Sequence, residues 1–523
     1  MLLSYDADRR MAGDRQVMRA NTPQARARVA ERLRYALGPE GRPAGLSALA
    51  LFWPHVTLAQ AGDPLRAARA KGRRLSAAAL EAAVASRLSD DAEAAAVTGV
   101  SPDVDDGPEA ASASAAAAAH EAYFAWPGAL PEPLADAGAE HMARAMDGDT
   151  PSEALLEHVR VTLGTPAART IHPDLAVLAA HAPGNVAWRA VGTVVGSGAA
   201  AGAVTDAGLW DAAVRLADGL RSLFNRPDSI ALLTTLYGDD RPYWRSVLDY
   251  CADGNLQAVL DEYLFQLHSE TGGKNLDDDG LRALVGRAVE ALGLRRATYT
   301  AHDPALGNTA VPLTARFALR YGGSRATTDD DAAGVRQASV REAFNSPFAP
   351  FVLASTSVGQ EGIDFHWWSH AVVHWNLPGN PVDFEQREGR VNRFAGHAIR
   401  KNVAEAHWDE VVGSGAGAHS PWRIAFDAAV VAARTTQTRM GEFAPWWVYP
   451  GTARIQRVLA SYPLSKDESR YEQLRSDLTL YRLTLGQPRQ EDMVRLMTQR
   501  GAGGETVTID LRPPNVSAPT GHA

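Results

Sequence analysis

The sequence predicts an α/β lobe, with a parallel sheet and helices on both faces, embedded in a largely α-helical chain. Between about residues 300 and 415, short apolar runs alternate with polar loops and helix-compatible segments. That alternation is typical of the strand–loop–helix units of a parallel sheet. Before and after this region, apolar residues recur at helical spacing instead. A chain of 523 residues is long enough for several such domains.

The N-terminal region, residues 1–87, is predicted to be helical and rich in arginine. Residues 1–75 contain 14 basic and 6 acidic residues. This excess fits either a solvated helical surface or a face that contacts phosphates. The apolar run 46–54 closes at a proline and fits either a buried strand or a short helix.

Two further regions separate this N-terminal part from the α/β lobe. Residues 88–130 are acidic and then Ala/Ser-rich, which predicts a flexible linker or insertion because such a composition buries little apolar surface. Residues 131–298 carry helical periodicity throughout, interrupted by a flexible glycine-bearing stretch at 196–199.

The α/β lobe is placed at residues 299–415. Residues 316–323 alternate like a strand and end in two glycines, and a helix is predicted at 334–345. Strands are then expected at 351–354 and 371–373, each followed by a polar loop, before an arginine-bearing helix. A helical extension is expected at 416–500, with an N-cap near Ser465, and a disordered tail at 501–523.

Composition excludes several classes of protein. Cys251 is the only cysteine, which argues against an internal disulfide framework and a cysteine-based zinc site. No apolar run reaches 18 residues and the N-terminus is too charged for a signal peptide, so we expect no membrane partner and a cytoplasmic location. The formal net charge of -9 argues against a uniformly basic nucleic-acid binder.

Arg390 and Arg393 are the strongest candidates for phosphate chemistry. They are three residues apart on a predicted helix, which would place them on one face, with Gln386 one turn earlier. A guanidinium is planar, always charged and able to bind phosphate through two hydrogen bonds, and Gly389 would let a ligand approach the backbone. The alternative is a surface helix whose arginines pair with Glu385 and Glu388.

Two segments in the correct order carry a family resemblance. Residues 355–364, with Gly359, Gly362 and Asp364, resemble motif V of superfamily-2 helicases. Residues 386–393 match the pattern Q-x-x-G-R-x-x-R and resemble motif VI. The intervening residues 375–381 are similar to the Swi/Snf-type or a related bacterial branch. The resemblance covers about residues 300–410 and implies the second, RecA-like motor lobe, with residues 317–321 as motif IV.

The resemblance implies roles for individual residues. Arg393 would be the catalytic arginine finger, and Arg390 would hold the γ-phosphate or couple its loss to closure of the lobes. The ATP-binding residues would be Gln386, Gly389, Arg390, Arg393, Gly362 and Asp364. The nucleic-acid-binding residues would be Ser355, Thr356, Ser357 and Gly322. ATP and Mg²⁺ are the expected cofactors, and no metal-binding residues are assigned in this chain. Asp364 has a local alternative, capping backbone N–H groups of its own loop.

The first lobe of such a motor needs a Walker A loop, G-x-x-x-x-G-K-[ST], whose lysine and backbone amides hold the phosphates. The chain has four lysines, and none is followed by serine or threonine; residues 272–275 come nearest. A Walker B candidate at 258–263 has apolar residues at helical spacing, which favours a helix with solvated Asp261 and Glu262. Neither Walker motif is therefore found.

We accordingly expect an ATP-dependent helicase or translocase lobe that is inactive alone. A separate polypeptide or an upstream segment would supply the first lobe, and nucleic acid would be the partner, with DNA favoured over RNA. The alternative is a non-catalytic nucleic-acid-binding or scaffold subunit. Two residue patterns favour structural roles. A strand would spread out the three histidines, which are His366, His370 and His374, and would not gather them on a metal. Core packing or a position at the lobe edge suits the three tryptophans better than base stacking: Trp367, Trp368 and Trp375.

Overall fold

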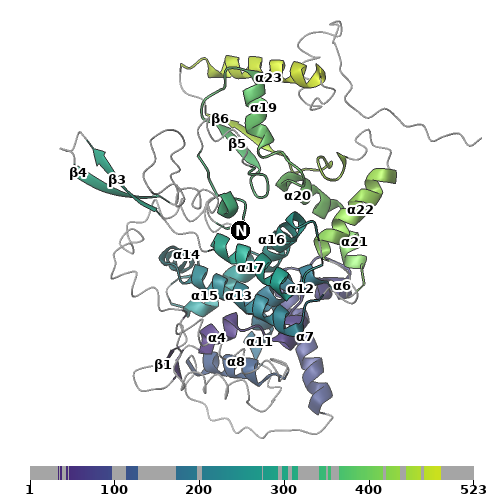
Figure 1. The fold of residues 1–523 in the computed structure, drawn as a ribbon. Coiled ribbons are helices and arrows are strands. Elements are labelled where there is room, and N and C mark those ends of the chain that lie inside the picture. The colour runs from purple at the N-terminus through teal and green to yellow at the C-terminus, as the bar shows by residue number, and fades with distance from the viewer. Residues whose placement is uncertain are drawn as a thin grey trace, which may run out of the picture. The chain divides into compact units, whose positions relative to one another are not determined.

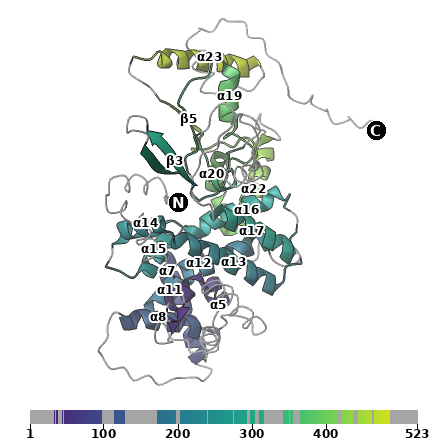
Figure 2. The ribbon, with the colours of Figure 1, turned by 60° about the vertical axis from the view of Figure 1, so that its left-hand side comes forward.

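The computed structural model divides the chain into two compact units, residues 1–354 with 403–445, and residues 355–402 with 446–523. Figures 1 and 2 show the ribbon in two views. The residues that the structure describes are 33, 36–37, 43–44, 46–96, 113–127, 172–196, 203–238, 240–273, 275–292, 297–303, 309–315, 341–348, 351–354, 364–415, 420–435, 443–460 and 464–484.

The first unit is built mainly from helices (Figure 1). The flexible linker predicted at 88–130 differs from its described parts: one helix runs to Ala96, and Ala113–Ala125 is a helix whose Tyr123 and Phe124 are buried. The run 46–54, which fitted a strand or a helix, forms a buried helix. The helices of this unit are α4 (Leu46–Phe52), α5 (Val56–Ala61), α6 (Pro64–Lys71), α7 (Ala77–Ala96), α8 (Ala113–Ala125), α11 (Pro173–His181), α12 (Pro183–Val195), α13 (Asp206–Phe224), α14 (Pro227–Tyr237), α15 (Tyr243–Asp253), α16 (Leu256–Glu270), α17 (Asp278–Leu292), α21 (Trp408–Gly413) and α22 (Pro421–Thr435).

Helix α12 is the centre of this helical core. It packs on α4, α5, α11, α13 and α16, and most of its residues are buried. At Gly184 a Cβ atom would lie 2.7 Å from the backbone carbon of Phe52, so only glycine lets α12 pass so close to α4. Close-packed interiors have no room for such an added carbon, and the crossing depends on this one residue.

A buried arginine closes the ends of two helices around α12. Arg189 donates hydrogen bonds to the carbonyl oxygens of Ala59 (3.0 Å), in α5, and of Ala179 and Ala180 (2.9 and 2.6 Å), in α11. The last carbonyls of a helix have no partner within the helix, and a buried one must find another. Burial lowers the pKa of Arg189 to about 10, so the guanidinium stays charged at neutral pH.

Two strand pairs of the first unit are antiparallel. Strands β3 (Ala297–Asp303) and β4 (Thr309–Ala315) form a hairpin in which Ala297 faces Ala315. The short strands β1 (Ala36–Leu37) and β2 (Pro43–Ala44) also pair antiparallel. The hairpin lies at the predicted start of the α/β lobe, so this part of the lobe departs from an all-parallel sheet.

Within its described residues, the second unit contains one parallel strand pair, where the sequence predicted a larger parallel sheet. Strand β5 (Ala371–His374) pairs in parallel with β6 (Gln456–Leu459), so that Val373 faces Val458. Helix α19 (Pro381–Gly389) follows β5 and packs on α23 (Asp467–Thr484), and α20 (His397–Ala406) comes next in the chain. Strand β6 was not anticipated, because only helices were expected after residue 416.

The strand predicted at Phe351–Ala354 is not found. These residues have no regular secondary structure, and Val352 is 77% exposed. An apolar run forms a strand only when a neighbouring strand satisfies its backbone groups, and composition does not reveal that neighbour. The end of the helix predicted at 334–345 is helical over residues 341–344. The strand predicted at 316–323 lies outside the described residues.

Candidate functional site

The candidate arginines lie in a turn, not on a helix. Helix α19 begins at an Asn380 cap, whose side chain accepts the N–H of Asp383 at 2.8 Å, and it ends at Gly389. The N–H groups of Val391 and Asn392 then both donate to the carbonyl of Glu388 at 3.0 Å. The prediction that Arg390 and Arg393 share one helical face is therefore wrong, because these bonds close the helix before Arg390.

The turn brings the two motif segments into direct contact. A guanidinium nitrogen of Arg393, Nη2, lies 2.8 Å from Oδ1 of Asp364. The backbone N–H of Phe365 donates to the carbonyl of Arg390 at 3.0 Å, and that of His397 donates to His366 at 3.0 Å. Segments that are about 30 residues apart in sequence are thus fixed against each other by backbone bonds, with an ion pair between their charged side chains.

The surface of this turn is open to a ligand. The side chains of Arg393 and Asp364 are 43% and 45% exposed, and Gln386 is exposed on α19. No atom lies within 4 Å of the place where a Cβ of Gly389 would be. An anion could therefore approach the backbone at Gly389, in the same turn as the exposed Arg393.

A buried ion pair anchors α19 from behind. Glu388 is 2% exposed, and its carboxylate accepts two bonds from Arg457 on β6, with Nη2–Oε2 at 2.9 Å and a second bond from Nε to Oε1. The guanidinium carbon of Arg457 lies 4.9 Å from the ring centre of Phe384. The sequence interpretation paired Glu388 with arginines of its own helix; its partner is instead 69 residues away.

The three histidines do not gather around one point. His374 is buried, its ring stacks on Phe384 with centres 4.4 Å apart, and its Nε2 is 3.7 Å from Oε1 of Glu388. The ring of His370 instead lies 5.4 Å from that of His397. Within the described part of the chain, no cluster of three or more His, Cys, Asp or Glu residues could hold a metal ion.

A second buried arginine supports the loop after Arg393. Arg400 is fully buried, and it donates hydrogen bonds to the carbonyls of Ala395, at 2.8 Å, and of Trp367. Its guanidinium carbon lies 5.6 Å from the ring centre of Trp368. Burial, with the positive charges of Arg400 and Arg393 nearby, lowers the pKa of His366 to about 4. Nothing in the sequence pattern distinguished Arg400 from a surface arginine.

The nearest match to a Walker A loop has a different structural role. Gly272 and Gly273 have positive φ angles of 77° and 62°, and they end helix α16 by donating to the carbonyls of Ser269 and His268. A phosphate loop needs free backbone N–H groups at the start of a helix after a strand. Here the N–H groups are used to close the end of a helix.

The Walker B candidate lies in helix α16, as the apolar spacing predicted. Asp261 is not solvated, however: its side chain is partly buried and accepts a hydrogen bond from Gln257 at 2.8 Å. Gln257 in turn accepts from Arg189 at 2.7 Å. Burial raises the pKa of Asp261 to about 7, and its bond from Gln257 links it to the buried Arg189.

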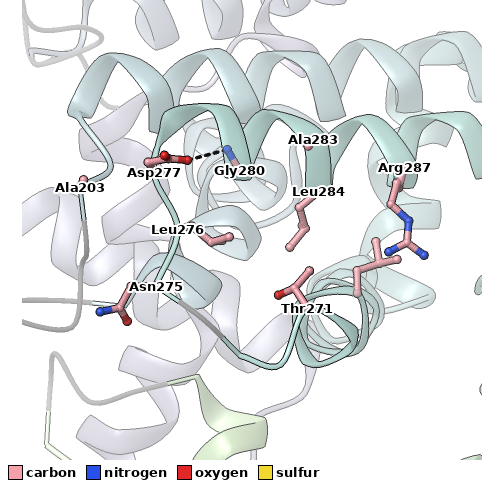
Figure 3. A pocket seen from close by; sticks show the side chains of 10 residues that line it. Ala203, Thr271, Asn275, Leu276, Asp277, Gly280, Ala283, Leu284 and Arg287 are labelled. Atoms are coloured by element: carbon pink, nitrogen blue, oxygen red, sulfur yellow. Dashed lines mark hydrogen bonds between the residues drawn. The ribbon is translucent and has the colours of Figure 1, made fainter.

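The first unit contains a cavity of about 660 Å³. Figure 3 shows side chains that line it. The Asp277 carboxylate there accepts the N–H of Gly280 at 2.8 Å. Arg287 pairs with Glu270 at 2.8 Å and Glu342 at 3.5 Å, so its charge is already balanced. The remaining lining is mostly apolar and contains none of the predicted site residues: Ala203, Leu267, Thr271, Asn275, Leu276, Ala283 and Leu284.

Several predicted site residues lie outside the described residues. These are Ser355, Thr356, Ser357, Gly362 and Gly322. Their roles stay predictions. No helix within the described ranges is long and apolar enough to cross a membrane.

The comparisons with known proteins give one finding. Residues 330–395 match the family model described as the helicase conserved C-terminal domain. The matched stretch contains both Asp364 and the turn with Arg390 and Arg393. No curated protein and no solved structure matches the chain. The match does not distinguish a Swi/Snf-type branch from others.

Proposed function

We propose that this chain supplies the second lobe of a superfamily-2 motor that hydrolyses ATP and moves along nucleic acid, because residues 330–395 match the helicase conserved C-terminal domain. The contact between Asp364 and Arg393 is the observation that carries this proposal. It joins a residue of motif V to the candidate arginine finger on an exposed surface. A motor needs such a link, because nucleotide state must be coupled to the strand.

ATP is the substrate that we assign to the open surface of the turn. Arg390 and Arg393 supply positive charge, Gln386 supplies a hydrogen-bonding amide, and Gly389 leaves the backbone accessible. The role we assign to Arg393 is to stabilise the negative charge that spreads over the transferred phosphoryl group, an effect worth roughly 10³ to 10⁵ in rate for an arginine finger. Mg²⁺ would neutralise phosphate charge and would be held mainly by the opposite lobe.

The opposite wall of the ATP site would come from a first lobe. None of the four lysines in the sequence fits a Walker A motif, and Gly272 and Gly273 end a helix. A separate polypeptide or an upstream segment would therefore provide the phosphate-binding lysine. The complete motor would act in the cytoplasm.

Nucleic acid would contact Ser355, Thr356 and Ser357, together with Gly322. Hydroxyls and backbone groups of this kind bind phosphates and sugars, which carry little sequence information. Binding should therefore weaken steeply with salt and depend little on sequence, with DNA favoured over RNA.

The test is to measure ATP hydrolysis by this chain alone, and then mixed with a polypeptide that carries Walker A and Walker B motifs, each with and without a DNA strand. The proposal expects no turnover by the chain alone and DNA-stimulated turnover by the mixture. Hydrolysis by the chain alone would contradict the missing lobe. If the mixture binds DNA but never hydrolyses ATP, the non-catalytic nucleic-acid-binding subunit is the better account.

A further inference from the structure

A partly exposed aromatic cluster begins at Phe394, the residue after the candidate arginine finger. The rings of Phe394 and Trp446 stack, with centres 5.2 Å apart and an angle of 7° between their planes. Trp447 meets Phe394 edge-on at 6.0 Å. Phe394 and Trp447 are each 48% exposed. Large aromatic surface left in water is costly, so an exposed cluster of this kind marks a place where something binds.

The backbone holds this cluster rigidly. The N–H of Ala395 donates to the carbonyl of Trp446 at 2.6 Å, and Ala395 has a left-handed φ of 48°, which is strained for a residue with a Cβ. Asn402 fixes the loop that follows the tryptophans: its amide donates to the carbonyls of Tyr449 and Ala453, each at 3.1 Å, and its oxygen accepts the N–H of Ala453 at 2.9 Å.

The charge around the cluster favours a polyanion. The segments that carry the aromatic residues, 389–402 and 446–460, contain no Asp or Glu, although the whole chain has a formal net charge of -9. Their basic residues are Arg390, Arg393, Arg400, Lys401, Arg454 and Arg457. Arg400 and Arg457 are committed to internal contacts and Arg393 pairs with Asp364, whereas Lys401 is exposed.

We propose that Phe394, Trp446 and Trp447 form a base-stacking platform for single-stranded nucleic acid, next to the arginines of motif VI. The aromatic faces take the bases, and the acid-free segments around them accept the phosphates of the same strand. Stacking suits a motor that reads no sequence, since every base has a π face. The proposal rests on the nucleic-acid function above, and it adds a contact surface that motifs IV and V do not include.

The test is binding of a fluorescein-labelled deoxythymidine strand of about 20 nucleotides, longer than the roughly 4–16 nucleotides that single-strand-binding folds cover, to the whole chain without ATP. Fluorescence anisotropy at fixed salt gives the affinity. The double variant Phe394→Leu, Trp447→Leu should bind about 10- to 100-fold more weakly, since each stacked base contributes strongly. The matched variant Phe394→Tyr, Trp447→Phe keeps the rings and should bind within about twofold of the natural chain.

Two further measurements, the salt dependence of binding and competition by AMP, distinguish base stacking from other causes of weaker binding. The slope of affinity against salt should be the same in the leucine variant as in the natural chain, because that slope reflects the number of phosphate contacts. AMP should not displace the strand. Equal binding by the leucine and natural chains, or displacement by AMP, would overturn the platform and leave the proposed function standing. Failure of the natural chain to bind any strand would overturn both. Thermal unfolding of each variant confirms that it is folded.

Discussion

Oδ1 of Asp364 and Nη2 of Arg393 are 2.8 Å apart, in a pair whose side chains are close to half exposed. A few residues before Arg393, Glu388 points the other way and is bound by Arg457 in the interior. The same short stretch therefore carries one exposed and one buried ion pair. Their chemistry is alike but their surroundings differ, so their contributions to stability should differ as well.

The exposed pair should contribute little to stability. Replacing Asp364 by Asn should change the free energy of unfolding by less than about 1 kcal/mol, because exposed ion pairs are screened by water and salt. Urea unfolding followed by circular dichroism measures this. A loss of several kcal/mol in the free energy of unfolding would mean that the pair is structural. Arg393 would then not be available as an arginine finger.

The buried pair should be costly to break. Replacing Glu388 by Ala should destabilise the second unit by about 3–5 kcal/mol, because Arg457 is left buried without its partner. The double variant Glu388→Met, Arg457→Met should recover much of that loss, since neither charge remains. If Glu388→Ala lowered the free energy of unfolding as little as Asp364→Asn does, Glu388 would not anchor the helix.

Two glycines of helix α12 should respond in opposite ways. Gly184→Ala should destabilise the first unit by about 1–3 kcal/mol, because the new Cβ meets the backbone of Phe52 and Trp53 at 2.7–2.8 Å. On the same helix, the new Cβ of Gly192→Ala would meet nothing within 4 Å, so this variant should stabilise the first unit by roughly 0.5–1 kcal/mol. Thermal unfolding of both variants measures these changes in stability. Equal effects would contradict the close crossing of α12 and α4.

Acid should destabilise the first unit through buried neutral histidines. The imidazole Nδ1 of His55 accepts the N–H of Leu58 at 3.3 Å and Nε2 bonds to the carbonyl of Trp126 at 3.0 Å. Burial lowers the pKa of His55 from 6.5 to about 4. Between these values the unfolded chain binds a proton that the folded chain does not. Stability is therefore complete above pH 6.5 and falls as the pH drops towards 4.

For His55 the loss should reach about 3 kcal/mol, from a shift of this size. His120 and His181, each with a pKa lowered to about 4 by burial, add to the slope. The variant His55→Gln should be less stable at pH 7 but show a shallower slope between pH 6.5 and 4. Urea unfolding at a series of pH values checks this. An unchanged slope would show that His55 is not the titrating group.

Sequence patterns predicted the features that depend on local chemistry. The apolar spacing around Asp261 gave a helix, and the valines of β5 gave a strand, because both patterns are short-range. The resemblance to helicase motifs V and VI agrees with the family model that matches residues 330–395. Gly389 ends α19, but the sequence interpretation continued the helix through Arg393, since the bonds from Val391 and Asn392 to Glu388 leave no simple signal.

Features that depend on distant partners could not be predicted. Glu388 looked like a surface residue until β6 brought Arg457 to it from 69 residues away. Phe351–Ala354 looked like a strand, although no neighbour pairs with it in the described residues. The aromatic cluster also joins Phe394 to Trp446, which are far apart in sequence and had been given no role. Such contacts are set by tertiary packing, which a single sequence does not show.

The rate of DNA-stimulated ATP hydrolysis by the Arg393→Ala chain, mixed with a polypeptide that carries the Walker motifs, tests the central claim most directly. If Arg393 is the finger, the rate should fall by roughly 10³- to 10⁵-fold while the strand still binds. Arg387→Ala is the matched control, since Arg387 donates to the carbonyl of Asn376 at 2.6 Å and is given no catalytic role. Hydrolysis by the Arg393→Ala mixture at the natural rate would contradict the account.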